Sequence, residues 1–226
     1  MRYHPDKEIL ERYATGDIDS AHGAAVATHL ETCSHCRHLV AKFEEEAADS
    51  FVASGAEGAI SDAELALVFD NMMNDIMTLD ADFSKSKVRS SATVNVNGKA
   101  FKVPPTLAPL VERMGEWKSY GGKVFTSSID IDEDCKVSLL YITEGVQVPQ
   151  HTHKGFESTL VLHGSFSDEN GEYGEGDFVR EDGNTKHAPQ TAVGQDCLCL
   201  SILTEPMIFT QGVARVFNRF GKGMYP

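Results

Sequence analysis

The spacing of apolar residues changes once along this chain of 226 residues, near residue 85. Before that point apolar side chains recur every three or four residues, which is the period of an amphipathic helix. Four groups carry the pattern: Ile9, Leu10 and Tyr13; Ala25, Val26 and Leu30; Leu39, Val40 and Phe43; and Leu65, Val68, Phe69, Met72, Met73 and Ile76. The last group follows a capping-box pair, Ser61 and Glu64, which predicts a helix that runs to about Asp80.

The rest of the chain consists of short β-rich runs separated by Gly and Asp. The runs are residues 92–96, 123–131, 136–143, 156–166, 177–181 and 197–204. Short strands separated by turn residues in this way are typical of an all-β domain, such as a small barrel or sandwich. We therefore expect a helical domain in residues 1–85, a linker and leading segment in 86–105, and a β-domain in 106–226.

The charge of the chain is strongly negative and unevenly distributed. The formal net charge is -14, and residues 1–85 carry 17 Asp and Glu against 6 Lys and Arg. Proteins that bind nucleic acid need clustered Lys and Arg to displace the counterions of the phosphates, and the sequence has no such cluster. A basic protein partner is therefore expected rather than direct contact with nucleic acid.

Neither a signal peptide nor a membrane span is expected. The first residues lack an uninterrupted apolar stretch, and no run approaches the roughly 18 to 20 apolar residues that cross a bilayer. The five cysteines include two with metal-ligand spacing, which fits thiols in a reducing compartment. The sequence thus predicts a cytoplasmic protein without membrane contact.

A first metal-ligand pattern, His29-x3-Cys33-x2-Cys36, lies in the helical half. His29 and Cys33 are one helical turn apart, and Cys36 follows a break in the helix, so all three can face one ion. A sulfur-containing set of this kind usually holds structural zinc. Spacing leaves the fourth ligand open among His4, His22, His35 and His38. The alternative is a redox-active or inert Cys-x2-Cys, but this stretch lacks the βαβ pattern of thioredoxin-like motifs.

A second pattern, His151-x-His153-x3-Glu157, lies in the β-rich half, with His187 thirty residues further on. On a strand, side chains alternate between faces, so the first two histidines share one face. Three imidazoles and one carboxylate suit zinc, iron, manganese or nickel, and such a site is where chemistry or sensing occurs. Gly164 suits a hairpin bend after these residues.

The stretch from about residue 117 to 203 resembles a cupin, a small jelly-roll-like β-barrel whose paired motifs place three His and one Glu on a metal. The first motif matches fully. The second departs at Asp182, Asn184 and Thr191, where Pro, Gly and Asn are typical. Asn tolerates the left-handed conformation of the usual Gly, so the turn before His187 is expected to form.

A helical zinc domain followed by a single cupin resembles the ChrR family of anti-sigma factors over most of the chain. The resemblance implies a zinc-binding helical bundle that binds an extracytoplasmic-function sigma factor and hides its contacts with RNA polymerase. It implies that the cupin is needed for the response to singlet oxygen and related oxidative stress. The implied ligands are His4, His29, Cys33 and Cys36 at the first site, and His151, His153, Glu157 and His187 at the second.

The family's barrel also has a cysteine pair that Cys197 and Cys199 resemble. Two residues apart on a strand, these thiols are expected to share a face, in either a buried structural role or a redox or signalling role. The leading hypothesis is a regulator without catalytic residues. The alternatives are a metal-dependent cupin oxygenase or related enzyme with a helical accessory domain, and a cupin regulator that touches DNA itself, which the charge distribution disfavours.

Overall fold

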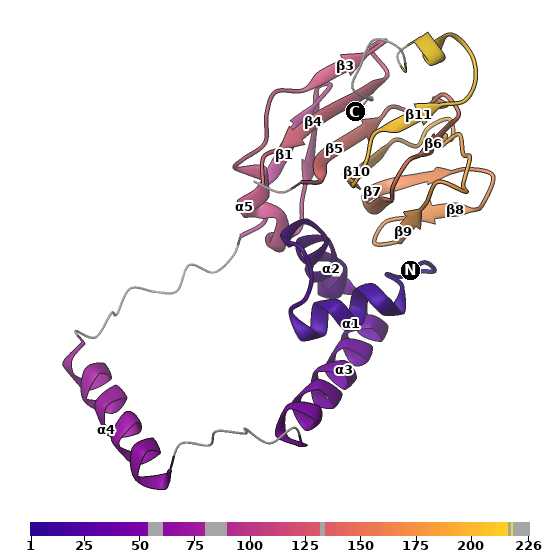
Figure 1. Cartoon of the computed structure of the whole chain (residues 1–226). Helices are drawn as coiled ribbons and strands as arrows, with labels where there is room; N and C mark the ends of the chain where they lie inside the picture. Colours follow the sequence, from indigo (N-terminus) through magenta and orange to yellow (C-terminus); the bar gives the residue numbers. More distant parts are fainter. Residues whose placement is uncertain (54–60, 80–89, 132–133, 217, 219–226) are drawn as a thin grey trace. The chain divides into compact units, whose positions relative to one another are not determined.

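The computed structural model describes residues 1–53, 61–79, 90–131, 134–216 and 218 (Figure 1). Within these ranges the chain is helical at first and then almost entirely β-structure, as the change of apolar period predicts. The chain forms two compact units, one made of Met1–Glu44 together with Arg89–Pro226, the other of Glu45–Val88. No helix in the described ranges is long and apolar enough to cross a membrane.

Capping residues mark the ends of the first two helices. The helices are α1 (Lys7–Thr15), α2 (Ser20–Thr32) and α3 (Ser34–Ala53). The Asp6 carboxylate accepts the N–H of Ile9 at 2.9 Å and so caps α1, which ends at Gly16 with a φ of 74°. Asp19 caps α2 through the N–H of His22 in the same way. A single residue, Cys33, separates α2 from α3, which is the break that the first metal pattern requires.

Helix α4 (Asp62–Thr78) begins at the predicted capping box, with Ser61 and Glu64 bonded reciprocally. Asp80, where we expected the helix to end, lies outside the described residues. The apolar residues of α4 are exposed rather than buried, with Val68 55% and Met72 51% exposed. Soluble proteins rarely leave such a contiguous apolar face uncovered unless it binds a partner.

The β-half is built around one antiparallel sheet of seven strands, ordered β3-β4-β5-β10-β7-β8 with β9 also paired to β7. The strands are β3 (Lys118–Tyr120), β4 (Val124–Ile129), β5 (Lys136–Ile142), β7 (Glu157–Ser167), β8 (Glu172–Gly174), β9 (Phe178–Glu181) and β10 (Cys197–Leu203). A separate pair, β6 (His151–His153) and β11 (Met207–Phe209), contributes the histidine strand. The chain ends, as far as it is described, near the short 3-10 helix η2 (Val213–Val216).

The predicted linker contains ordered structure. A hairpin of β1 (Thr93–Val96) and β2 (Lys99–Lys102) is followed by η1 (Pro105–Leu107) and the one-turn α5 (Ala108–Val111). The Phe101 ring packs against Tyr141 of the barrel with a centroid separation of 5.3 Å. This segment therefore belongs to the larger compact unit.

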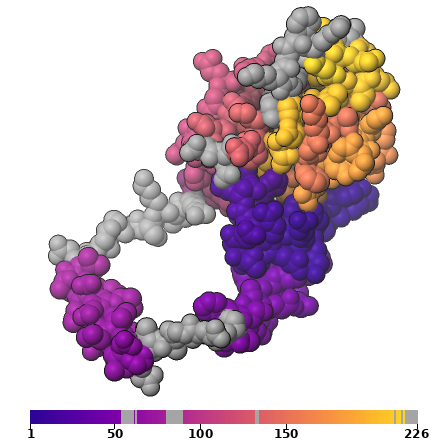
Figure 2. All heavy atoms as spheres, viewed as in Figure 1, coloured from indigo at the N-terminus to yellow at the C-terminus, as the bar shows by residue number. Residues whose placement is uncertain are grey.

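The first two helices pack directly on the barrel and share its core (Figure 2). Leu10 and Val26 are 1% and 0% exposed and belong to the same apolar cluster as Leu160 and Phe178 of the barrel. His22 also reaches Ser158 of β7 at 3.1 Å. The compact units thus do not follow the expected division at residue 85, because apolar burial joins residues 1–44 to the β-half.

One local expectation was wrong. Gly164 does not form a hairpin bend but lies inside β7 with a φ of 70°, next to an irregularity in its register with β10. A Cβ there would come 1.9 Å from the carbonyl oxygen of Asp196, so the close approach of two strands requires glycine. The turn before His187 forms as expected, with the N–H of Thr185 donating to the carbonyl of Asp182 at 3.1 Å. Asn184 does not need the left-handed conformation for this turn, since among the described non-glycine residues only Asn97 has a positive φ.

Candidate metal centres

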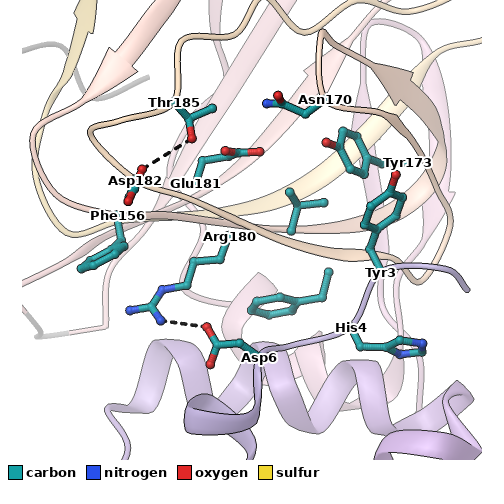
Figure 3. Close-up of a pocket in the computed structure, with 12 residues that line it drawn as sticks. Tyr3, His4, Asp6, Phe156, Asn170, Tyr173, Arg180, Glu181, Asp182 and Thr185 are labelled. Carbon is teal, nitrogen blue, oxygen red and sulfur yellow. Dashed lines mark hydrogen bonds and ion pairs between the residues drawn. The ribbon is translucent and has the colours of Figure 1, made fainter.

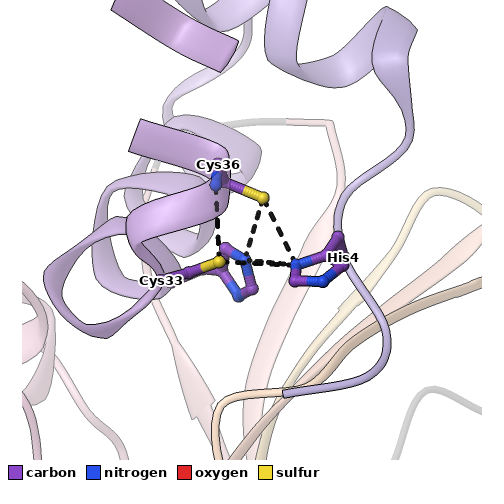
Figure 4. Close-up of side chains that lie close together, drawn as sticks. His4, Cys33 and Cys36 are labelled. Atoms are coloured by element: carbon purple, nitrogen blue, oxygen red, sulfur yellow. Dashed lines mark hydrogen bonds between the residues drawn. The ribbon is translucent and has the colours of Figure 1, made fainter. Parts of the chain in front are cut away.

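The first candidate centre lies where α2, α3 and residues 1–4 meet (Figure 4). His29 is in the last turn of α2, Cys33 caps that helix, and Cys36 is in the first turn of α3. His4 joins them from the segment before α1. The structure therefore brings together the four residues that the family resemblance implied, one ligand atom from each lying within 4.8 Å of the others. His22, an alternative by spacing, is instead bonded to Asp19.

The separations of these donor atoms fit a tetrahedral ion. His4 Nδ1 lies 3.4 Å from both sulfurs and 3.5 Å from His29 Nε2, which in turn lies 3.3 Å from Cys36 Sγ. Zinc bonds of about 2.0 Å to nitrogen and 2.3 Å to sulfur place neighbouring ligands roughly 3.3 to 3.8 Å apart. Two imidazoles and two thiols at these distances are a closed donor set for zinc.

Burial sets the protonation of this centre. It lowers the pKa of His29, which keeps the imidazole neutral and ready to bind a metal, and it also lowers the pKa of His4 with help from His35. Burial and the neighbouring Cys33 raise the pKa of Cys36 to about 12. A metal ion at this centre would therefore have to displace the Cys36 proton on binding.

The second candidate centre lies inside the barrel. His151 and His153 share a face of β6 and are both 2% exposed, whereas Thr152 between them is half-buried, as the strand alternation predicts. Glu157 is the first residue of β7. His187 lies opposite His151, and the two exchange backbone hydrogen bonds of 3.0 and 3.1 Å. Strand pairing thus places all four side chains.

The four side chains of this centre converge closely enough for one ion. His153 Nε2 lies 3.2 Å from His187 Nε2 and 3.1 Å from a carboxylate oxygen of Glu157. The His151 ring centroid is 4.5 Å from that of His187, and one ligand atom from each of the four residues lies within 4.8 Å of the others. Nitrogen and oxygen donors without sulfur fit zinc, iron, manganese or nickel.

Sequence reasoning did not find the groups that orient these donors. Asp168 Oδ2 accepts the Nδ1–H of His187 at 2.9 Å, Ser201 donates to Glu157 at 2.8 Å, and the carbonyl of Pro149 accepts from His151 at 2.9 Å. For His151 and His187 such contacts leave Nε2 free for a metal and fix the ring plane, whereas the buried Nδ1 of His153 has no hydrogen-bond partner in the described structure. They join residues up to 44 positions apart, so no local spacing reveals them.

The charges of the second centre are already arranged for a cation. Burial lowers the pKa of His151 to about 4 and also lowers that of His153. Burial alone would raise the pKa of Glu157, but the three histidines together hold it below its ordinary value. Burial alone would lower the pKa of His187, but Asp168 and Glu157 raise it. The centre is therefore an anionic, buried donor set that still carries a proton on His187 at low pH.

Cys197 and Cys199 share a face of β10, with their sulfur atoms 3.4 Å apart and their side chains 0% and 2% exposed. They pack with Tyr173 and Phe166 in a cluster apart from either donor set. The hydrogen bond with Cys197 and complete burial raise the pKa of Cys199 well above its ordinary value. The reactive thiolate form is thereby suppressed.

Comparison with known proteins identifies the family and the fold of the chain. The family described as the ChrR Cupin-like domain matches residues 117–205. The chain is 30% identical to the anti-sigma-E factor ChrR of Cereibacter sphaeroides, over 97% of this chain and 98% of that protein. It is also similar to a crystal structure of Rhodobacter sphaeroides SigE in complex with the anti-sigma ChrR, with a TM-score of 0.66 and 30% identity, covering 89% of this chain and 98% of that one.

The fold and the two donor sets together define a cupin-like protein with an amino-terminal helical domain and two candidate metal-binding sets. The extent and identity of the match then assign the chain more narrowly. It belongs to the ChrR family of anti-sigma factors.

Proposed function

We propose that this protein is an anti-sigma factor that binds and inhibits an extracytoplasmic-function sigma factor through its helical domain. Family membership supports a regulatory rather than an enzymatic role. The partner is inferred from the related ChrR, whose structure was determined in complex with SigE. We further propose that the protein acts in the cytoplasm and touches neither nucleic acid nor membrane directly.

The exposed apolar face of α4 is the observation that carries this proposal. Leu65, Val68, Phe69, Met72 and Ile76 follow the spacing of one helical stripe, and each is more than half exposed. The exposed methionines of this helix, Met72, Met73 and Met77, suit protein binding because their flexible side chains adapt to the partner's surface. Acidic residues on the same helix, such as Asp70 and Asp75, fit the basic partner expected from the net charge.

Two matched charge substitutions on α4 test this surface. Met72→Asp places a carboxylate in the stripe, whereas Asn74→Asp adds the same charge two residues later, on the opposite side of the helix. With candidate sigma factors of the same genome, Met72→Asp is expected to weaken binding at least about tenfold and to relieve inhibition in transcription in vitro. Asn74→Asp is expected to change neither. Equal effects of the two substitutions would place the contact elsewhere.

We propose zinc at both centres, with iron, manganese or nickel as alternatives at the second. The closed, sulfur-containing set of His4, His29, Cys33 and Cys36 supports a structural ion that holds three chain segments together. In the second set, His151, His153, Glu157 and His187 would hold the ion, which would supply a site for sensing.

The cupin is proposed to be needed for release of the sigma factor under singlet oxygen or related oxidative stress. His151→Ala removes one donor of the second set while leaving the helical domain and α4 unchanged. We expect this variant to inhibit normally and to lose the stress-induced release. His163→Ala is the matched control, because His163 is a half-exposed barrel histidine outside both sets. A normal response from His151→Ala would place sensing elsewhere.

For Cys197 and Cys199 the complete burial of both thiols supports a structural role. A redox or signalling role remains the alternative for this pair. The enzyme alternative predicts turnover of a substrate with oxygen by the metal-loaded protein. Membership of the anti-sigma family instead favours regulation.

A further inference from the structure

Residues 1–4 lie along the turn that joins β8 to β9, and a barrel carboxylate holds them there. Asp177 Oδ1 accepts the backbone N–H groups of Arg2 at 2.6 Å and Tyr3 at 3.1 Å. The N–H of Phe178 donates to the carbonyl of Tyr3 at 3.1 Å. The Asp177 side chain is buried, with 5% of the residue exposed. The backbone immediately before the candidate ligand His4 is thus fixed by the cupin domain.

The turn that provides these contacts is itself rigid. Asp177 Oδ2 accepts the N–H of Gly174 at 2.9 Å, and the N–H of Gly176 donates to the carbonyl of Val161 in β7 at 2.9 Å. Gly176 has a φ of 87°, and a Cβ there would come 3.0 Å from the Met1 side chain. Only glycine fits this position without strain.

The same turn orients a second candidate ligand of the first centre. The carbonyl oxygen of Gly176 accepts the Nδ1–H of His29 at 2.8 Å. This bond assigns the proton of the neutral ring to Nδ1 and leaves the Nε2 lone pair directed at the thiols of Cys33 and Cys36. Two of the four donors therefore depend on the barrel for their position.

We propose that the cupin domain completes the first metal centre, with Asp177 and Gly176 as positioning groups for His4 and His29. The helical part then supplies the four donors of the centre, and the cupin part supplies the groups that position two of them. Carboxylates and carbonyls that orient ligands typically change metal affinity by about 10- to 100-fold when removed. This inference rests on the metal binding proposed above.

A continuous set of contacts extends from Tyr3, beside this turn, to the second centre. The ring of Tyr3 packs on that of Tyr173 (Figure 3), and the ring centroids are 4.6 Å apart. The Tyr173 hydroxyl donates to Asp168 Oδ1 at 3.2 Å, and Asp168 Oδ2 accepts from His187 at 2.9 Å. We propose that an ion in the second centre, by fixing His187, would steady the residue next to His4 through these contacts. The two centres would then be coupled, and linkage would make the effect reciprocal.

Asp177→Ala in the full-length chain tests the positioning role. After loading with cobalt, thiolate-to-metal absorption reports the first centre alone, because the second donor set has no sulfur. We expect Asp177→Ala to speed metal loss from the first centre to a chelator about 10- to 100-fold while the second metal is retained. Asp177→Asn keeps one acceptor oxygen, so it is expected to fall between Asp177→Ala and the unmodified chain. Glu175→Ala, an exposed neighbour on the same turn, is the control.

Three outcomes separate the inference from the metal binding on which it rests. Metal loss at the unmodified rate from a folded Asp177→Ala chain would overturn the positioning role. Equal loss from Asp177→Ala and Glu175→Ala would also overturn it, because the effect would then belong to the turn in general. An unmodified chain that binds no metal at the first centre would overturn the proposed metal site itself.

The coupling has its own test, which also serves if Asp177→Ala does not fold. Tyr173→Phe removes the hydroxyl bonded to Asp168 and keeps the ring against Tyr3. Metal loss from the first centre is measured in the unmodified chain, in Tyr173→Phe, in His187→Ala and in the double variant. We expect each single change to speed the loss several-fold and the double variant to be no faster than the faster single one. Effects that multiply, or single variants without effect, would overturn the coupling.

Discussion

The two candidate metal centres are built on scaffolds of opposite kinds. At the first, donors come from residues 1–4 and from two helices that meet at Cys33. Individual hydrogen bonds to Asp177 and Gly176, rather than a strand ladder, hold residues 1–4 and His29 in place. At the second, His151, His153 and Glu157 lie on strands that ladder hydrogen bonds already hold. We therefore expect the ion of the first centre to join separate chain segments, and the ion of the second to occupy a preformed site and to exchange without loss of the barrel.

Removing one thiol of the first centre is the change with the largest expected effect. Cys36→Ser leaves three donors and removes most of a structural zinc site, whose binding free energy in small zinc domains is about 10 kcal/mol or more. We expect loss of the first metal, a fall in helical circular dichroism and loss of sigma-factor binding, with the second metal retained. Cys135→Ser is the control, since Cys135 lies outside both donor sets. A Cys36→Ser chain that stays helical and inhibits would show that the helices do not need the ion.

The centres should also differ in how pH changes their metal affinity. Because the pKa of Cys36 is raised to about 12, a metal must displace its proton throughout the neutral range. Affinity at the first centre should thus fall roughly tenfold or more for each pH unit lost. At the second centre His151, with a pKa lowered to about 4, and Glu157, with a pKa held low, have already lost their protons. Only His187, with a raised pKa, still competes with the ion through a proton.

Single-centre variants make this difference measurable. His151→Ala leaves only the first centre, and Cys36→Ser leaves only the second. Chelator competition measures metal affinity across a range of pH. The logarithm of the affinity plotted against pH should be a steep line for the first centre. For the second centre it should be a curve that flattens once the pH exceeds the pKa of His187. Parallel lines for the two variants would contradict the assignment of protons.

Short-range spacing predicted much of both centres, and long-range contacts account for what it did not predict. His29, Cys33 and Cys36 lie within two helical turns, and His151 and His153 on one strand face, so local period places them. His4 is 25 positions from His29, and only the family resemblance selected it as the fourth ligand. The carbonyl of Gly176 has no signature in sequence, because every residue has one.

The reach of local sequence patterns also explains which strands were predicted and which were missed. Six β-rich runs of five or more residues were predicted, and each coincides with a strand. The three-residue strands β3, β8 and β11 and the four-residue β2 were missed, since an alternation of side chains is not visible over so few positions. In the predicted linker and leading segment, 86–105, the run 92–96 was expected, but its packing was not, because the burial of Phe101 involves Tyr141, forty residues away.

The smallest expected effect concerns a single hydroxyl at the second centre. Ser201 is fully buried on β10 and donates to Glu157 Oε1 at 2.8 Å, which holds the carboxylate with its other oxygen toward His153. Ser201→Ala leaves a buried charged acceptor without its donor, a loss of about 1 to 3 kcal/mol, and should weaken the second metal roughly tenfold.

The barrel should survive the loss of this hydroxyl because strand pairing, not the ion, maintains it. Competition with a chelator measures the metal affinity, and thermal unfolding measures the barrel. Ser165→Ala, which removes a hydroxyl bonded to Gln195, is the control for losing a serine from a neighbouring strand. If Ser201→Ala instead both weakened metal binding and clearly lowered the unfolding temperature of the barrel, and Ser165→Ala did neither, the second centre would be structural like the first. The contrast between a folding ion and an exchangeable one would then disappear.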